Sequence, residues 1–224
     1  MPLFADRRSA GRALARAVRA AVPETPVVLA LPRGGVPVGF EVATSLKAAL
    51  DVLIVRKLGM PGEEELAIGA IASGDIRVLN RELIKHLDVS EELLEEVTIR
   101  ERAELERREQ LYREGQQPLT VSGKTIVLVD DGLATGATMF AAAKSLLPRG
   151  VRKIIAAVPV AAKPTCDELG REVDQVVCLS TPHPFESVGQ WYEDFRPTSD
   201  KEVRELLHKS AQNSKLDAQH AVHS

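Results

Sequence analysis

The stretch Thr125-Ile-Val-Leu-Val-Asp-Asp-Gly-Leu-Ala-Thr-Gly-Ala-Thr-Met139 decides how this chain is expected to fold. Its apolar start is typical of a buried parallel strand, and its end opens an apolar helical pattern. Between the two lie the adjacent carboxylates Asp130 and Asp131 and a loop of glycines and threonines. Ligand groups gather at the carboxyl ends of parallel strands, so the turn is the expected binding site.

The loop in this stretch has the composition of a phosphate cradle. Gly132 and Gly136 let the backbone come close to a ligand, while Thr135 and Thr138 add hydroxyl donors. Unpaired N–H groups and the dipole at a helix start both favour an anion. The two carboxylates would repel that anion and suit sugar hydroxyls, or a metal ion that the substrate carries. The pattern therefore predicts a sugar phosphate as ligand.

Residues 127–139 resemble the signature with which type I phosphoribosyltransferases bind 5-phosphoribosyl 1-pyrophosphate (PRPP): apolar residues, two acids and a loop ending in Thr-Gly-x-Thr. No Gly-Lys-Ser/Thr follows, so the loop is not of the Walker type. The resemblance implies that Asp130 and Asp131 hold the ribose hydroxyls. It also implies that the 5-phosphate binds the loop of Ala134, Thr135, Gly136, Ala137 and Thr138.

A second loop, Leu31-Pro-Arg-Gly-Gly-Val36, repeats this logic with a guanidinium in place of the acids. Arg33 and the N–H groups around Gly34 and Gly35 suit an oxyanion, although glycines are also common in ordinary β-α turns. In the family that the chain resembles, the early loop receives the pyrophosphate of PRPP, and its backbone often contains a strained peptide.

Arg56 and Lys57 follow the apolar run 51–55 and are expected to end a second parallel strand. The resemblance implies that Lys57 binds pyrophosphate together with Arg33, Gly34 and Gly35. The alternative is a charge pair at a strand end that faces solvent.

Apolar runs and helical patterns alternate along the chain, which predicts an α/β fold with a parallel sheet. The resemblance specifies a Rossmann-like phosphoribosyltransferase core with helices on both faces, a small hood and a long charged helical insertion. We expect one domain over 1–209, with the insertion at about 88–116, the hood at about 181–200 and a flexible tail at 210–224. Strands are expected at 27–31, 51–55, 68–72, 76–79, 125–129, 153–160 and 173–179, and helices at 6–21, 36–50, 90–115, 163–171 and 200–209.

The acceptor is the least defined part of the pattern. Enzymes for 6-oxopurines generally carry an Asp directly before the Thr-Gly pair, where this chain has Ala134. A general base would then come from elsewhere, and the candidates are Glu63, Glu64 and Glu65, which also fit a solvated acidic turn. A helix over the aromatic segment would place Trp191 and Phe195 on one face to stack on an acceptor. The alternative for these aromatics is a small satellite core.

Composition limits the remaining classes of function. Lys and Arg total 29 against 32 Asp and Glu, so no polyanion-binding surface is expected and nucleic acid is not a predicted partner. Cys166 and Cys178 are expected to be reduced, buried thiols rather than a disulfide or metal pair. The first residues lack the apolar core of a signal peptide and no segment reaches membrane-span length, which predicts a cytoplasmic protein.

The resemblance implies an enzyme of nucleotide metabolism: a magnesium-dependent glycosyltransferase that moves the phosphoribosyl group of PRPP to a nitrogenous acceptor such as a purine or pyrimidine base. Asp130 and Asp131 would act on the sugar side, and Arg33 and Lys57 on the leaving-group side. Mg²⁺ would be held mainly by PRPP, with no certain protein ligand. The resemblance is compatible with a homodimer. The alternative is a non-catalytic PRPP sensor that keeps the cradle without transfer.

Overall fold

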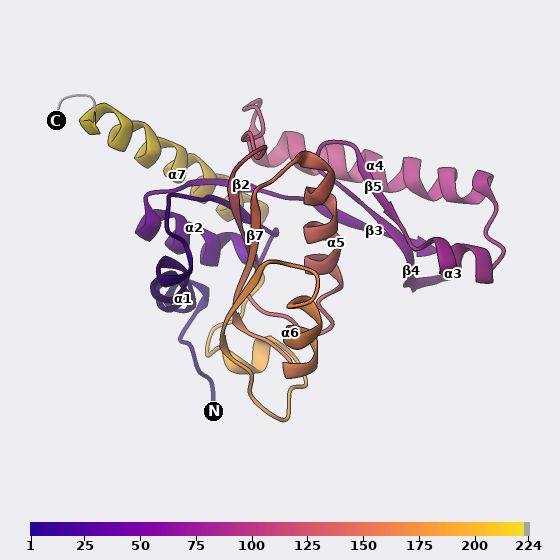
Figure 1. Ribbon diagram of the computed structural model, residues 1–224, viewed down its shortest axis with the longest axis horizontal. Helices are drawn as coiled ribbons and strands as arrows, with labels where there is room; N and C mark the ends of the chain where they lie inside the picture. Colours follow the sequence, from indigo (N-terminus) through magenta and orange to yellow (C-terminus); the bar gives the residue numbers. More distant parts are fainter. Residues whose placement is uncertain (222–224) are drawn as a thin grey trace.

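A five-stranded parallel sheet forms the centre of the molecule, with the strand order β2-β1-β6-β7-β8 (Figure 1). The computed structural model describes residues 1–221, apart from the side chains of Glu64, Glu65 and residues 214–221. The apolar runs form strands because each is paired on the sheet and covered on its faces. The strands are β1 (Val27–Ala30), β2 (Ala49–Val52), β6 (Thr125–Val129), β7 (Lys153–Val160) and β8 (Gln175–Ser180).

Helices cover both faces of this sheet, as predicted. Each face of the sheet has its own hydrophobic core, and alternate residues of β6 point into one or the other. On one face, Val127 and Val129 pack with α1 (Arg7–Ala21) and α2 (Gly35–Leu46). On the other face, Ile126 and Leu128 pack with α5 (Ala137–Leu146) and α6 (Lys163–Leu169). This alternation is the two-residue period of a strand whose two faces are both buried.

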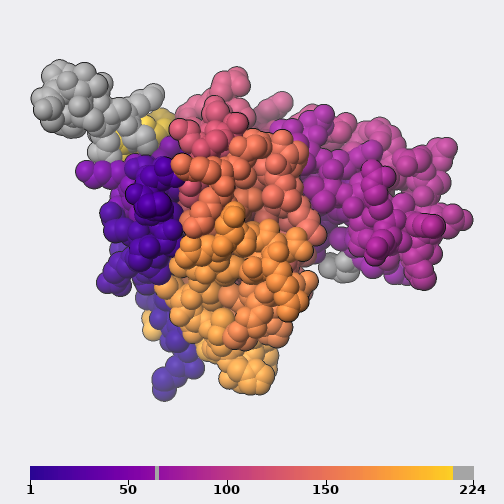
Figure 2. Space-filling view, viewed as in Figure 1, coloured from indigo at the N-terminus to yellow at the C-terminus, as the bar shows by residue number. Residues whose placement is uncertain are grey.

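A second, antiparallel sheet extends from one end of the molecule, at the right of Figure 1 and in magenta in Figure 2. It consists of β3 (Val55–Met60), β4 (Glu63–Ala72) and β5 (Ile76–Leu79), of which the last two form the predicted hairpin. The short helix α3 (Arg81–His86) and the long helix α4 (Glu91–Arg113) complete the extension. Ser90 caps α4 by accepting the N–H of Leu93 at 3.2 Å.

Two predicted boundaries were wrong in this part of the chain. The helix that was expected to reach residue 50 ends at Leu46, with Lys47 in the left-handed conformation (φ 53°). The chain turns early because residues 49–52 are needed to pair with β1. The parallel strand β2 then ends at Val52, so Arg56 and Lys57 lie inside β3 and do not end a parallel strand.

The last helix, α7 (Asp200–Ala221), is longer than the predicted helix that ended near residue 209. It packs against α2, β2 and α4 and so joins the parallel sheet to the extension. Two 3₁₀ turns occur at Leu147–Arg149 and Gly189–Trp191. In the described part of the chain, no helix combines the length and apolarity needed to span a membrane.

Candidate active site

The two glycine-containing loops of the sequence meet at the carboxyl ends of β1 and β6. A side chain at Gly34 would collide with the carboxylate of Asp131, and a Cβ at Gly35 would lie 2.6 Å from the carbonyl oxygen of Val129. The Leu31 N–H donates to the same Val129 carbonyl at 2.9 Å. Only glycine therefore permits this approach, and the peptide between Pro32 and Arg33 is cis.

Asp131 is held by side chains from both ends of the chain. Arg7 Nε donates to Asp131 Oδ2 at 2.8 Å, and the side chains of the two residues are only 11% and 14% exposed. The Arg7 guanidinium also donates to the Arg196 carbonyl at 2.8 Å and stacks on Phe195 at 3.9 Å. Tyr192 donates its hydroxyl to the Asp131 carbonyl at 2.5 Å. Neither Arg7 nor this role of Tyr192 could be predicted from the sequence, because no local pattern links residues so far apart.

Burial makes the carboxylate pair costly to ionise. Burial raises the pKa of Asp130 well above its ordinary range, and the neighbouring Asp131 charge raises it further. Burial also raises the pKa of Asp131, but the hydrogen bond and charge of Arg7 oppose that rise. Oδ1 of Asp130 accepts the Asp131 N–H at 2.8 Å. A pair of buried acids with perturbed pKa values beside a glycine turn is typical of a functional site.

The predicted phosphate loop lies directly beside the acids. Gly136 has φ 71°, which glycine adopts without strain, and caps the start of α5. The first N–H groups of α5, at Ala137 and Thr138, have no partner within the helix and suit an anion. Ala134 and Thr135 are exposed, whereas Thr138 is half-buried. The loop thus offers backbone donors and hydroxyls to solvent next to the carboxylates.

Thr165 on α6 forms a hydrogen bond to this loop. Its Oγ1 donates to the Ala134 carbonyl at 2.6 Å. A Cβ at Gly136 would lie 2.6 Å from Thr165 Cγ2, so the two groups are in close contact. Leu133 is paired with Ala161 in a parallel bridge, which fixes the start of the loop.

Arg33 lies at the same edge, 48% exposed, with Nη1 3.7 Å from Oδ1 of Asp200. The hydroxyl of Tyr112, at the end of α4, donates to that Asp200 oxygen at 2.7 Å. Burial and the Asp200 carboxylate raise the pKa of Tyr112 to about 12, so it remains a donor at neutral pH. Asp200 is therefore a counter-ion that a bound anion would have to replace at Arg33.

The other predicted cations have different surroundings. Arg56 is bound to Glu101 on α4, with Nη2 2.5 Å from Oε2. Lys57 is exposed and lies opposite Ala70 in the antiparallel sheet. The geometry thus groups Asp130, Asp131 and the Gly34 turn, and it places Lys57 on a separate sheet.

The aromatic segment is not the helix that would put Trp191 and Phe195 on one face; only a 3₁₀ turn at Gly189–Trp191 forms. Trp191 packs with Phe185, at 6.2 Å between ring centroids, and Phe195 with Tyr192 at 5.1 Å. The segment belongs to a small satellite core, which was the alternative interpretation. Of the three candidate bases, Glu63 begins β4 and is exposed, and the side chains of Glu64 and Glu65 lie outside the described residues.

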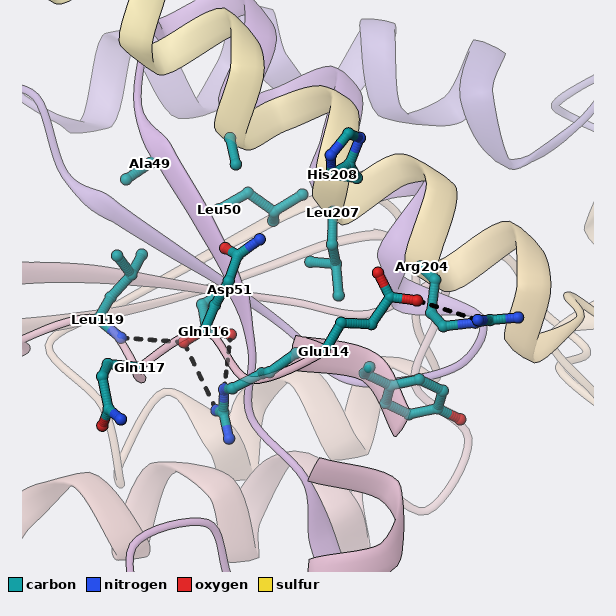
Figure 3. Close-up of a pocket in the computed structure, with 13 residues that line it drawn as sticks. Ala49, Leu50, Asp51, Glu114, Gln116, Gln117, Leu119, Arg204, Leu207 and His208 are labelled. Carbon is teal, nitrogen blue, oxygen red and sulfur yellow. Dashed lines mark hydrogen bonds and ion pairs between the residues drawn. The ribbon is translucent and has the colours of Figure 1, made fainter. Parts of the chain in front are cut away.

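A cavity of about 250 Å³ lies elsewhere, between β2, the end of α4 and α7 (Figure 3). Its floor holds the buried ion pair of Arg113 Nε and Asp51 Oδ1, at 3.2 Å. Oδ2 of Asp51 also accepts the Leu119 N–H at 3.0 Å. Both oxygens of the Asp51 carboxylate accept hydrogen bonds from within the protein. None of the predicted site residues lines this cavity.

Comparison with known proteins identifies a family for this chain. The sequence model described as "Phosphoribosyl transferase domain" matches residues 7–190. This chain belongs to that family. Two Mycobacterium tuberculosis proteins, from strains CDC 1551 / Oshkosh and ATCC 25618 / H37Rv, are provisionally named phosphoribosyl transferases and are each 45% identical over 212 residues.

The match to these relatives covers 94% of this chain but 47% of each relative, so the chain spans about half their length. A solved structure, that of TT1426 from Thermus thermophilus, is 41% identical and superposes with a TM-score of 0.85. It covers 93% of this chain, and 99% of TT1426 is matched. The phosphoribosyl transferase fold of this chain is therefore shared over nearly the whole of a solved relative.

Proposed function

We propose that this phosphoribosyl transferase domain catalyses transfer of the 5-phosphoribosyl group from PRPP to a nitrogenous acceptor, with release of pyrophosphate. The observation that carries the proposal is the contact between the Asp130–Asp131 pair and the Gly34–Gly35 turn, beside the loop 134–138. This edge offers carboxylate acceptors, backbone donors and a guanidinium within one site. A sugar bearing a phosphate on one carbon and a pyrophosphate on another needs all three.

The sugar hydroxyls of PRPP are assigned to the carboxylates. The Asp130 side chain receives a backbone N–H at Oδ1, which leaves acceptor capacity on Oδ2. Arg7 satisfies one oxygen of Asp131 and holds the carboxylate against the Gly34 turn. The 5-phosphate would then receive the N–H groups at the start of α5 and the hydroxyls of Thr135 and Thr138.

The leaving pyrophosphate is assigned to the turn around Gly34 and Gly35 and to Arg33, with Lys57 as a second cation that rests on the family resemblance. Breaking the bond between C1 of the ribose and pyrophosphate builds positive charge on the sugar and negative charge on the leaving group. Buried carboxylates beside the sugar stabilise the first charge, and Arg33 stabilises the second. These residues act mainly by position and charge.

Magnesium fits this site as an ion that arrives with PRPP. Among the described residues, no group of three His, Cys, Asp or Glu side chains could hold a metal ion. One oxygen of Asp131 is already bound to Arg7. Mg²⁺ is commonly held by substrate phosphates and water with few protein ligands, and when bound it would neutralise charge on the departing pyrophosphate.

The experiment that tests the proposal is pyrophosphate release from PRPP and Mg²⁺ across a panel of purines, pyrimidines and other nitrogen acceptors. Release that depends on one acceptor supports transfer and identifies that acceptor. The control is Asp130→Asn with Asp131→Asn, which should be inactive while still folded. Tight PRPP binding without release across the panel would instead support the alternative, a PRPP sensor. Absence of PRPP binding would contradict both.

A further inference from the structure

Two consecutive carbonyl groups at the start of the phosphate loop are bound to the beginning of α6. The Leu133 carbonyl accepts the N–H of Ala162 at 2.9 Å. The Ala134 carbonyl accepts the hydroxyl of Thr165 at 2.6 Å. Ala162 is the N-cap residue of α6, and Thr165 lies in the first turn of that helix. The carbonyl side of the loop therefore faces α6.

The N–H groups of the same loop are not bound in this way. Within the described residues, the N–H groups of Thr135, Gly136, Ala137 and Thr138 donate to no protein group. Gly136 is left-handed, with φ 71°, and the right-handed turn of α5 follows it. Such a change of hand makes successive N–H groups converge on an anion. The loop thus has its first carbonyls bound to protein and its N–H groups free for a ligand.

We propose that Thr165 is a positioning residue of the candidate active site, which directs the N–H of Thr135 towards the 5-phosphate by holding the Ala134 carbonyl. This inference rests on the proposed function, because it takes the loop 134–138 as the site of the 5-phosphate. Thr165 acts through the backbone of the loop and is not assigned a contact with the substrate.

The planar peptide between Ala134 and Thr135 connects the Thr165 hydroxyl to this donor. The peptide is trans, since the cis bonds of the chain lie at Pro32-Arg33 and His183-Pro184. In a trans peptide the C=O and N–H groups point in opposite directions. Because the Ala134 carbonyl points at Thr165, the Thr135 N–H points away from α6. Rotation of this peptide would exchange the two groups and present a carbonyl oxygen to the anion, which would repel it.

The methyl group of Thr165 makes a separate contact. A Cβ built on Gly136 would lie 2.6 Å from Thr165 Cγ2 and 3.0 Å from the ring of Phe140, so both side chains cover this glycine. Gly136 is buried, whereas Ala134 and Thr135 are exposed. Packing therefore fixes Gly136, and the hydrogen bond from Thr165 fixes the exposed peptide before it. Valine at position 165 would keep the methyl group without the hydroxyl, and serine would do the reverse.

The first test measures NMR order parameters of the loop amides in the ligand-free protein. Loss of the hydroxyl frees the Ala134–Thr135 peptide, so the order parameter of the Thr135 amide should fall from about 0.85 to below about 0.6 in Thr165→Val. Thr165→Ser should keep the wild-type value. The Gly136 amide should change less than the Thr135 amide in Thr165→Val, because the methyl group still covers it. Equal values for Thr135 in the wild type and Thr165→Val would overturn the positioning role, whatever the substrate.

The second test measures the affinity of the same three proteins for ribose 5-phosphate and for pyrophosphate by calorimetric titration. Thr165→Val should bind ribose 5-phosphate about fivefold more weakly, the effect of one hydrogen bond, and pyrophosphate as the wild type does. Thr165→Ser should bind both ligands as the wild type does. The thermal unfolding midpoint of each variant should stay within about 3 °C of the wild type, because water can replace the hydroxyl at this exposed carbonyl.

Three results of the titrations would overturn the assignment of Thr165. These are an unchanged affinity of Thr165→Val for ribose 5-phosphate, an equal loss for both ligands, and a Thr165→Ser variant as weak as Thr165→Val. A wild type that binds neither ribose 5-phosphate nor PRPP would contradict the proposed function and, with it, the phosphate role of Thr165. The order parameters would still decide whether the Thr165 hydroxyl orders the loop.

Discussion

Arg7 Nε lies 2.8 Å from Asp131 Oδ2, so the first turn of α1 holds one of the two signature carboxylates. Both side chains are mostly buried, and the same guanidinium reaches the Arg196 carbonyl and the ring of Phe195. One cation therefore links the start of the chain, the signature and the segment before α7. This arrangement fixes the carboxylate through a guanidinium that is itself held by two further contacts.

We expect Arg7→Met to weaken PRPP binding and to lower the free energy of unfolding by about 3 kcal/mol, because it leaves a buried carboxylate without its partner. Arg7 opposes the rise in the Asp131 pKa, so its loss should raise that pKa and move the acid limb of PRPP binding to higher pH. Calorimetric titration with PRPP across pH measures the shift. Arg7→Lys keeps the charge and should lie between the two. Identical acid limbs in all three proteins would contradict this role.

Asp130→Asn should separate binding from stability. The folded-state pKa of Asp130 is raised, so Asp130 costs no stability below about pH 4, where both states are protonated. The cost grows as pH rises from about 4, where the unfolded chain ionises, and is complete above the folded-state pKa. The variant should therefore equal the wild type in acid and become the more stable protein as pH rises. Thermal unfolding across pH tests the sign. PRPP affinity should fall at least about 100-fold, the loss of roughly 2.7 kcal/mol of binding. Unchanged affinity would remove Asp130 from the ribose site.

Gly34→Ala should act on the carboxylate rather than on the backbone. The added methyl group would occupy the space of the Asp131 side chain. We expect a folded protein with PRPP affinity reduced about as much as in Asp131→Asn. PRPP titration of both single variants and of the double variant tests this. If both substitutions act through the Asp131 carboxylate, the loss of affinity in the double variant is smaller than the sum of the two single losses. Additive losses would show that Gly34 and Asp131 act independently.

Arg33→Ala should weaken PRPP and pyrophosphate binding much more than ribose 5-phosphate binding, because only the first two carry the group assigned to Arg33. Asp200→Asn is the matched variant, since it removes the carboxylate 3.7 Å from Arg33 Nη1 and leaves the guanidinium in place. It should tighten pyrophosphate binding, and more so at low ionic strength. Competition assays with the three ligands measure both changes. Equal losses for all three ligands in Arg33→Ala would argue against a leaving-group role.

Asp51→Ala should destabilise the fold without altering the chemistry of the site. Asp51 accepts from Arg113 and from the Leu119 N–H, and both charged side chains are buried. Loss of one partner from a buried pair costs about 3–5 kcal/mol, which urea unfolding would measure. Glu109→Gln, at a more exposed partner of Arg113, should cost much less. PRPP affinity of the folded protein should match the wild type in both variants.

The sequence was informative wherever a local pattern sets the structure. The apolar run and helical pattern around Asp130 and Asp131 predicted β6, the turn and α5, and Ser90 predicted the start of α4. It was less informative at Lys57, because an apolar run cannot show that residues 49–52 join one sheet and 55–60 another. It left two alternatives open for the aromatic segment, and the contacts among the rings decided for a small satellite core.

By itself, the sequence determined the alternation of strands and helices, the acid pair and the two glycine-containing loops, because backbone preference and burial follow from residues near one another in the chain. The tertiary structure decided which groups share a site. Arg7 meets Asp131 and Asp200 meets Arg33 because the fold brings together elements far apart in sequence. Such contacts depend on distance in space, which no local pattern of residues encodes.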